Sequence, residues 1–360
     1  MLPFFTEHFG NAASRNHPFG WKASKAVERA REQLGALIGA RFRDLVFTSG
    51  ATESNNLAIK GLAMRAPAGR RHVVTISTEH RAVLDPCRAL ERDGFRVTYL
   101  EVDREGRIDL DRLRGAVASD TLLVSAMSAN NEIGVLHPLA DIAQIAHAQG
   151  ALVHCDAVQS AGLIPLKVKE LGIDLVSLSA HKMYGPKGVG ALYVAKRDPA
   201  IDLEALIDGG GHERGYRSGT LNVPAIVGFG EAAELCRSQA DADGARLRAL
   251  RDRLWAALSH VDGIHLNGSM EARLPNNLNV RVENVHGESL LKSIAADVAV
   301  SSGAACATAS AEPSHVLRAM GLSDEDARAS IRFGLGRFTI EQEIDAAAQI
   351  VIDTVRHLRR

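Results

Sequence analysis

The sequence predicts an α/β fold, with a mainly parallel sheet covered by helices and a smaller α+β domain at the C-terminal end. Between residues 44 and 194, short apolar runs alternate with stretches of helical period. Runs without polar alternation are typical of strands buried on both faces, as in parallel sheets. Beyond residue 238, a charged amphipathic helix and sparse short strands replace this alternation. We therefore expect a large domain over residues 1–238 and a small domain over 239–360.

Each expected element follows from its local pattern. Apolar residues recur at helical spacing from Val27 to Leu37, and Gly39 is a suitable stop for that helix. The expected strands of the large domain are residues 44–48, 73–77, 97–102, 122–127, 151–156, 175–179 and 189–194. Helices are expected at 57–62, 82–91 and 139–147, with another beginning near residue 110. In the small domain we expect strands at 278–282 and 298–300, and helices at 241–258, 313–320 and from 341 onward.

The composition argues against several classes of protein. A net charge of −1 gives no reason to expect nucleic acid or an anionic membrane as a partner. No apolar run approaches the roughly 20 residues of a membrane span, and no signal peptide opens the chain. The 4 cysteines lack metal-type spacing, which favours free thiols in a reducing cytoplasm. Cys87, Cys155 and Cys236 lie in apolar contexts and are expected to be inert core residues.

Polar residues cluster where the expected strands end. His80, residues 130–132, Asp156 and residues 181–182 all lie at or just after a strand end. In open α/β sheets, ligands bind beyond the carboxyl ends of the strands. We therefore expect these residues to gather on one rim of the sheet.

Lys182 and Asp156 are the residue types that pyridoxal phosphate requires. A lysine beyond a strand end can form a Schiff base with an aldehyde cofactor, and an acid can pair with the pyridine nitrogen. Taken alone, either residue would more often be a surface lysine or an N-capping aspartate. Their order along the chain and their surroundings favour the cofactor.

Two further segments are candidate anion sites. The turn at Gly50, Ala51 and Thr52 opens a helix, where free backbone N–H groups favour a phosphate, although capping by Thr52 or Ser54 explains it equally well. The segment 209–220 holds two arginines and a threonine that could bind anions, or it is a solvated loop.

Cys306 and Arg332 stand out in the small domain. Cys306 lies among small residues, which suggests an accessible and nucleophilic thiol. Arg332 is embedded in an apolar run, which suggests a carboxylate partner.

Together these motifs resemble the cysteine desulfurases, pyridoxal-phosphate enzymes of the class V aminotransferase group, in particular the iron–sulfur-cluster-assembly type. The resemblance implies the fold type I of pyridoxal-phosphate-dependent transferases. It covers nearly the whole chain and rests on nine stretches in the family's order: HFGNAAS, FTSGATESNN, TEHRAVLDPC, NNEIG, HCDAVQS, SAHKMYGPKG, GGGHERGYRSGT, SSGAACATAS and SIRFGLGRFT.

The resemblance also implies roles for individual residues. Lys182 would hold the cofactor covalently, Asp156 would pair with its ring nitrogen, and His80 would stack on the ring and take part in catalysis. Thr220 would reach the cofactor of the other subunit in a homodimer. The remaining cofactor contacts implied are Ala51, Thr52, Asn131, Gln159, Ser179 and His181.

The implied reaction converts L-cysteine to L-alanine. Arg332 would bind the substrate carboxylate, with Asn131 nearby, and Lys182 would act as the base. Cys306 would take the sulfur as a persulfide and pass it to an iron–sulfur scaffold or another acceptor protein. The resemblance implies no resident metal, although Cys306 would be available as a transient cluster ligand together with a scaffold.

The sequence departs from the family at both ends, and two functions other than cysteine desulfurase are compatible with it. Family members usually begin with a further strand and an Ala-Thr-Thr turn and end with a longer tail, and the chain is expected to lack both. A selenocysteine lyase would share the cofactor and most of the motifs. A non-catalytic relative that acts in sulfur relay would share the fold alone.

Overall fold

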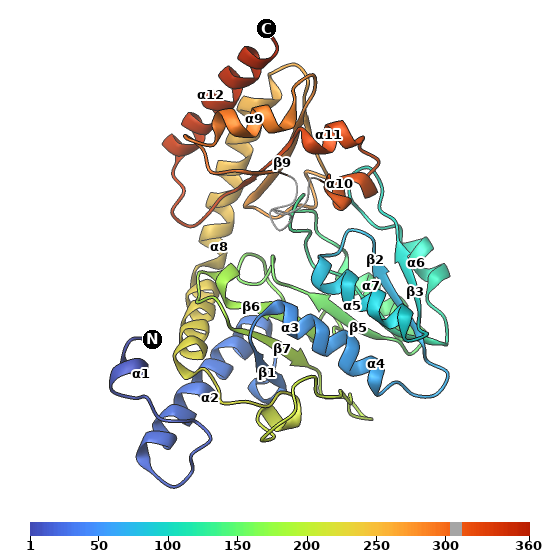
Figure 1. The fold of residues 1–360 in the computed structure, drawn as a ribbon, viewed down its shortest axis with the longest axis vertical. Coiled ribbons are helices and arrows are strands. Elements are labelled where there is room, and N and C mark those ends of the chain that lie inside the picture. The colour runs from blue at the N-terminus through green and yellow to red at the C-terminus, as the bar shows by residue number, and fades with distance from the viewer. Residues whose placement is uncertain (303–311) are drawn as a thin grey trace. The chain divides into compact units, whose positions relative to one another are not determined.

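The computed structural model describes residues 1–302 and 312–360, which form two compact units (Figure 1). The first unit comprises residues 1–100, 110–128 and 138–240. The second comprises residues 101–109, 129–137 and 241–360. Two short segments of the N-terminal part of the chain thus belong to the second unit. The expected domain boundary after residue 238 stays a prediction, because compactness alone does not show which segments fold independently.

The first unit is built on a seven-stranded sheet in the order β1-β7-β6-β5-β4-β2-β3. Its strands are β1 (Leu45–Thr48), β2 (His72–Ile76), β3 (Arg96–Leu100), β4 (Thr121–Ser125), β5 (Leu152–Asp156), β6 (Leu175–Ser179) and β7 (Gly190–Val194). The neighbours from β6 to β3 are parallel, which confirms the predicted mainly parallel sheet. Strand β7 runs antiparallel to both of its neighbours, β1 and β6. The short connection between β6 and β7 leaves no room for the crossover helix that a parallel pair needs.

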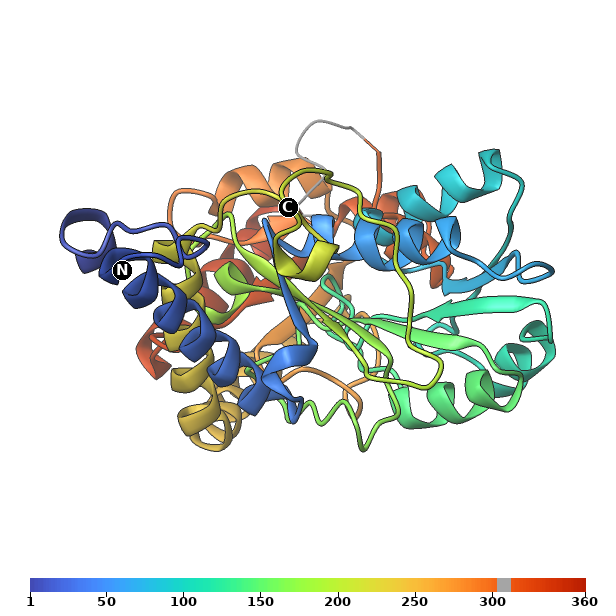
Figure 2. The same ribbon diagram turned by 90° about the horizontal axis from the view of Figure 1, so that it is seen from below.

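Helices cover both faces of this sheet (Figure 2). On one face lie α3 (Ala51–Asn56) and α5 (Arg81–Arg92), and on the other lies α7 (Leu139–Ala148). Helix α3 continues through the π-helical turn η2 (Leu57–Gly61) into α4 (Leu62–Met64). The other helical segments of this unit are α1 (Pro3–Thr6), α2 (Pro18–Ile38), η1 (Phe42–Asp44), α6 (Leu110–Ala116), η3 (Ala180–Met183) and η4 (Glu213–Gly215).

Helix α8 (Val223–Ser259) corrects one prediction. The expected helix over 241–258 is the end of a single helix of 37 residues. The first part of α8 contains Gly228 and Gly230, and glycine is unfavourable inside a helix. Gly230 is needed, however, because a Cβ atom at this position would lie 2.5 Å from the Cα of Ala30 in α2.

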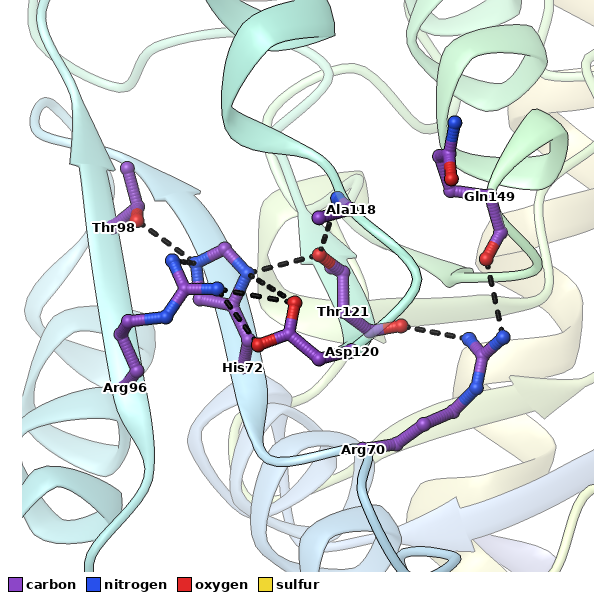
Figure 3. Close-up of polar contacts among 8 residues, drawn as sticks. All are labelled: Arg70, His72, Arg96, Thr98, Ala118, Asp120, Thr121 and Gln149. Carbon is purple, nitrogen blue, oxygen red and sulfur yellow. Dashed lines mark hydrogen bonds and ion pairs between the residues drawn. The ribbon is translucent and has the colours of Figure 1, made fainter.

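The amino ends of β2, β3 and β4 are joined by a polar network around the buried His72 (Figure 3). The imidazole Nδ1 lies 2.9 Å from Thr121 Oγ1, and Nε2 lies 2.8 Å from Thr98 Oγ1. Arg96 donates to Nε2 over 2.9 Å and also pairs with Asp120. This network fixes the strand ends opposite to the rim where ligands bind in such sheets.

The second unit contains a four-stranded antiparallel sheet in the order β10-β11-β9-β8. Its strands are β8 (Ile264–Leu266), β9 (Asn277–Val282), β10 (Ser301–Ser302) and β11 (Ser330–Gly334). Its helices, besides the end of α8, are α9 (Gly287–Ile294), α10 (His315–Ala319), α11 (Asp324–Arg328) and α12 (Glu341–Leu358). The predicted α+β character of this region is confirmed.

The strand expected at residues 298–300 is wrong. The Val298 N–H bonds to the carbonyl of Ile294, so the chain is still turning out of α9 at this point. The apolar side chains of residues 298–300 instead line a hollow together with Phe333 and Ile344. The strand begins only at Ser301, which pairs with Arg332.

Within the described part of the chain, no helix combines the length and the apolar character needed to cross a membrane.

Candidate active site

The carboxyl edge of the large sheet gathers three of the expected residues in the first unit. Asp156 is the last residue of β5, and Lys182 follows the end of β6, the neighbouring strand. His80 follows β2 and is the N-cap of α5, where its Nδ1 accepts from the Ala82 N–H at 3.0 Å. The rule that ligands bind beyond the carboxyl ends of the strands, called the strand-end rule below, therefore correctly predicted that these residues from distant parts of the chain lie on one rim.

Asp156 is a buried carboxylate with fixed geometry. Its Oδ2 accepts a 2.8 Å hydrogen bond from Asn55 Nδ2, and its Oδ1 accepts a 3.1 Å bond from the Val158 N–H. Burial raises the pKa of this carboxyl, while these two bonds and the nearby His80 act in the opposite direction. A buried acceptor held in this way suits the protonated nitrogen of a pyridine ring.

Asn55 was missed by the sequence reasoning. It lies on α3, four residues after Ala51, and it reaches Asp156 across 101 positions of sequence. The one available signal was an amide on the helix that opens at the expected phosphate site.

The start of α3 has the geometry of an anion site. Gly50 is the N-cap, and no side chain caps the helix, so the alternative of capping by Thr52 or Ser54 is excluded. The first N–H groups of such a helix have no acceptor within the helix. A Cβ atom at Gly190 would lie 2.6 Å from the Cα of Gly50, so only glycine lets β7 pass this turn so closely.

The segment after β6 carries Ser179, His181 and Lys182. Ser179 Oγ lies 2.9 Å from His181 Nδ1, which orients the imidazole. Burial, together with the positive charges of Lys182 and Lys187, lowers the pKa of His181. Lys182 itself is exposed on the 3-10 turn η3.

Two further residues expected to bind the cofactor also lie in the first unit. Gln159 is half-buried, three residues past the end of β5, and Thr220 is exposed at the end of the 209–220 loop. This unit therefore offers a buried carboxylate, an exposed lysine beyond the adjacent strand and a helix start free for an anion. These groups fit pyridoxal phosphate.

Asn131 and Arg332 belong to the second unit. Arg332, on β11, donates from Nη1 to the Asn131 carbonyl at 2.7 Å and from Nη2 to Ser301 Oγ at 3.2 Å. The neighbouring Glu132 is buried and accepts a hydrogen bond from Ser314. Burial raises the pKa of Glu132 to about 7, against the effects of Ser314 and Arg332. Arg332 is thus a half-buried cation with an ordered main-chain partner, suited to an anionic group.

Cys306, expected to be the nucleophile, lies outside the described residues. The other three cysteines are buried thiols, as predicted. Burial raises the pKa of Cys87 to about 12 and the pKa of Cys155 well above its ordinary value, so neither forms a thiolate readily. Among the described residues, no group of three or more His, Cys, Asp or Glu side chains could hold a metal ion.

Comparisons with known proteins agree with this arrangement. The family model described as aminotransferase class-V matches residues 1–347. The cysteine desulfurase IscS of Anaeromyxobacter sp. (strain Fw109-5) is 58% identical over 360 residues, which are 100% of this chain and 89% of that protein. The solved structure of a NifS-like protein has a TM-score of 0.91 at 36% identity and covers 99% of this chain and 94% of its own.

A further solved structure, SspA in complex with cysteine, has a TM-score of 0.82 at 37% identity and covers 94% of each chain. The predicted fold type I of pyridoxal-phosphate-dependent transferases is confirmed. The chain therefore belongs to the class-V aminotransferase family, and the resemblance to cysteine desulfurases seen in its motifs is confirmed.

Proposed function

We infer that the chain is a pyridoxal-phosphate-dependent cysteine desulfurase that converts L-cysteine to L-alanine and supplies sulfur for iron–sulfur clusters and other thio-cofactors. The observation that carries this inference is the position of the buried Asp156. Asp156 ends β5, the strand next to the one that presents Lys182, and it accepts a hydrogen bond from Asn55. Similarity to desulfurases over the full chain supports it. SspA, a structural relative, binds cysteine.

The cofactor, when bound, withdraws electrons from the Cα of the amino acid through its pyridine ring. Asp156 would keep the ring nitrogen protonated. The helix amides at Ala51 and Thr52, with Ser179 and His181, would hold the phosphate. His80 would stack on the ring, and Gln159 and Asn131 would bracket the ring hydroxyl. Lys182 Nζ would anchor the cofactor and take the Cα proton.

The substrate and the sulfur would be handled by the second unit. Arg332 would bind the substrate carboxylate, because a guanidinium pairs with a carboxylate through two parallel hydrogen bonds. Asn131, whose carbonyl Arg332 contacts, would lie near the substrate. The Cys306 thiolate would attack the substrate sulfur, so that an S–S bond forms on Cys306 as the C–S bond of the substrate breaks. The electron pair of the broken bond would stay with the carbon skeleton, which takes up a proton and leaves as alanine.

The partners that we propose are a second copy of the chain and a sulfur acceptor. Phe5, Phe9, Phe19 and Trp21 expose more than half of their surface in the first unit, and Phe9 stacks on Phe19 at 5.8 Å between ring centroids. Exposed apolar side chains in contact with one another, as Phe9 and Phe19 are, are typical of protein interfaces, which supports a homodimer. An iron–sulfur scaffold would receive the sulfur in the cytoplasm, with Cys306 as a transient cluster ligand.

The purified protein tests this proposal directly. With pyridoxal phosphate it should show the visible absorbance of a lysine-bound cofactor. Adding L-cysteine should release alanine and leave a reductant-sensitive mass increase on the peptide that holds Cys306. Faster turnover of selenocysteine than of cysteine would favour the selenocysteine lyase, and a protein that stays colourless and makes no alanine would favour the non-catalytic relay protein.

A further inference from the structure

In the part of the chain that the structure describes, the edge strand β1 is covered by side chains and not by another strand. An edge strand exposes one row of unpaired backbone groups. Here the Leu45 carbonyl accepts hydrogen bonds from Arg31 Nη1 and Arg214 Nη2, both at 2.8 Å. The Phe47 N–H donates to Glu213 Oε2 at 2.7 Å. Two of these side chains come from the 209–220 loop, which is thereby attached to β1.

Glu213 is the main attachment point. Both of its carboxylate oxygens accept from the guanidinium of Arg31, each at 2.8 Å. Only 3% of the Glu213 side chain and 8% of the Arg31 side chain are exposed. The guanidinium also lies 4.6 Å from the ring centroid of Phe47. A buried, bidentate pair of this kind fixes both position and orientation.

The loop takes an unfavourable backbone path at this point. Glu213 has φ 49° and Arg214 has φ 61°, so two consecutive non-glycine residues are in the left-handed region. Such conformations cost free energy and persist only where the surroundings impose them. A side chain could cover an edge strand without this strain. The strain therefore indicates that these contacts fix the path of the loop in addition to covering the edge of β1.

A second ion pair ties the same loop to the phosphate end of α3. Arg217 Nε donates to Glu53 Oε1 at 2.9 Å, with 21% and 13% of the two side chains exposed. The other Glu53 oxygen accepts from the Ser49 N–H, immediately before the helix. Although burial acts to raise it, the contacts with Ser49 and Arg217 hold the pKa of Glu53 below its ordinary value. The pair is therefore ionised at neutral pH.

The loop also closes on itself before Thr220. The Ser218 N–H donates to the Ile207 carbonyl at 3.1 Å, and the Gly219 N–H donates to His212 Nδ1 at 3.3 Å. Thr220 follows this closed ring and is exposed. Its hydroxyl is thus presented to the outside by a loop that is attached at two points.

We propose that Glu213 and Arg217 are positioning residues that, through Arg31 and Glu53, hold Thr220 in the orientation in which it binds the cofactor phosphate. The Arg217–Glu53 pair attaches the loop to α3, and Glu213 attaches it both to Arg31 of α2 and to the Phe47 N–H of β1. The loop is therefore fixed to the large sheet and the helices of its own subunit, and this frame sets the position from which Thr220 reaches the cofactor of the other subunit. The inference rests on the proposed function, in which Thr220 serves the cofactor of the other subunit.

A double-mutant cycle on the full-length protein tests the proposal. Arg217→Gln, Thr220→Ala and the double variant would be titrated with pyridoxal phosphate and, separately, with pyridoxal, which lacks the phosphate. We expect each single change to weaken pyridoxal phosphate binding by about tenfold, the effect of one hydrogen bond to a charged group. The double variant should also lose about tenfold, because both changes remove the same contact. Pyridoxal binding should not change.

Additive losses in the double variant, or equal losses for pyridoxal, would show that the pairs only stabilise the fold and would overturn the proposal. Glu213→Gln provides a second test, with its folding checked by circular dichroism, and should likewise weaken binding of the phosphate form alone. Arg337→Gln is the matched control, because Arg337 pairs with Asp243 at 2.7 Å with similar exposure, 17% and 16%, in the second unit. It should leave both affinities unchanged.

The cycle also separates this inference from the proposed function. If the wild-type protein binds pyridoxal phosphate and makes alanine while Thr220→Ala binds the cofactor normally, the positioning role is wrong and the desulfurase assignment stands. If the wild-type protein neither binds the cofactor nor uses cysteine, the proposed function itself fails.

Discussion

The two edges of the large sheet carry polar clusters of opposite character. At the amino edge, His72 is fully enclosed, and both of its ring nitrogens have partners inside the chain (Figure 3). Arg70 bridges the same edge by donating to the carbonyls of Thr121 and Gly150. At the carboxyl edge, Asp156 is buried and bonded, but Lys182 and Thr52 are exposed.

This difference in exposure distinguishes a polar cluster that only stabilises the fold from one that can bind a ligand. A buried polar network whose members satisfy one another stabilises strand register and has nothing left to offer a ligand. A buried acid with exposed nitrogen and hydroxyl groups nearby has one fixed anchor and several groups directed to solvent. Changes at the carboxyl edge should therefore affect chemistry, and changes at the amino edge should affect stability alone.

The largest effect is expected for Lys182→Ala. It should remove the visible absorbance of the lysine-bound cofactor and lower the turnover of cysteine by about 1000-fold or more, because anchor and base are lost together. Borohydride reduction followed by peptide mapping would locate the attachment. Lys187→Ala is the matched control, an exposed lysine five residues away, and should keep both colour and activity. A label on Lys187 would contradict the assignment.

Cys306→Ser should separate cofactor binding from sulfur removal. The variant should stay coloured, since no cofactor contact is lost, but alanine formation should fall by at least about 100-fold because a hydroxyl is a poor acceptor of sulfur. In the wild-type protein, added sulfur should map to Cys306 by mass spectrometry. Alanine at the wild-type rate, or sulfur on the buried Cys155, would rule out the persulfide step.

Asn55→Ala tests the anchor at the carboxyl edge. Removing the 2.8 Å bond leaves one oxygen of a buried carboxylate without its partner, so cofactor affinity should drop by about tenfold or more. Titration of the apoprotein gives the dissociation constant. Asn267→Ala removes a similarly buried amide in the second unit and should lower the melting temperature while leaving cofactor affinity unchanged.

The strands and the rim of the large sheet could be predicted because their signals are local. Each buried strand is a continuous apolar run, and the strand-end rule then placed Asp156 and Lys182 together whatever their distance in sequence. Strand β10 was missed because it has two residues and exists only by pairing with β11, whose paired residues lie 31 and 29 positions later. No local sequence pattern predicts such a pairing.

The contacts that hold the site could not be predicted for the same reason. Asn55 reaches Asp156 across 101 positions, and Arg31 reaches Glu213 across 182. Asparagine and arginine at these places are as compatible with a solvated helix face as with a buried partner. Only the packing of α2 and α3 against the sheet decides between the two.

The smallest effect is expected at the amino edge, where His72 should influence stability with pH and leave catalysis unchanged. Burial, and then the charge of Arg96, lower the pKa of His72 to about 4, while Asp120 acts in the opposite direction. In the unfolded chain a histidine takes up a proton near pH 6.5. Between about pH 6.5 and pH 4 the unfolded state therefore binds more protons at this residue than the folded state, and the free energy of unfolding falls as the pH is lowered.

Urea denaturation at pH 7.5 and pH 5.0 would measure this contribution. His72→Asn removes the titrating group and keeps a side chain able to bond to Thr121 and Thr98. The variant should start from a lower stability at pH 7.5 and lose less than the wild-type protein on going to pH 5.0. The matched control is Arg70→Gln, which removes polar contacts at the same edge of the sheet and leaves His72 in place. It should keep the wild-type pH dependence in this window, and a wild-type slope in the His72 variant would mean that this imidazole is not the group that titrates.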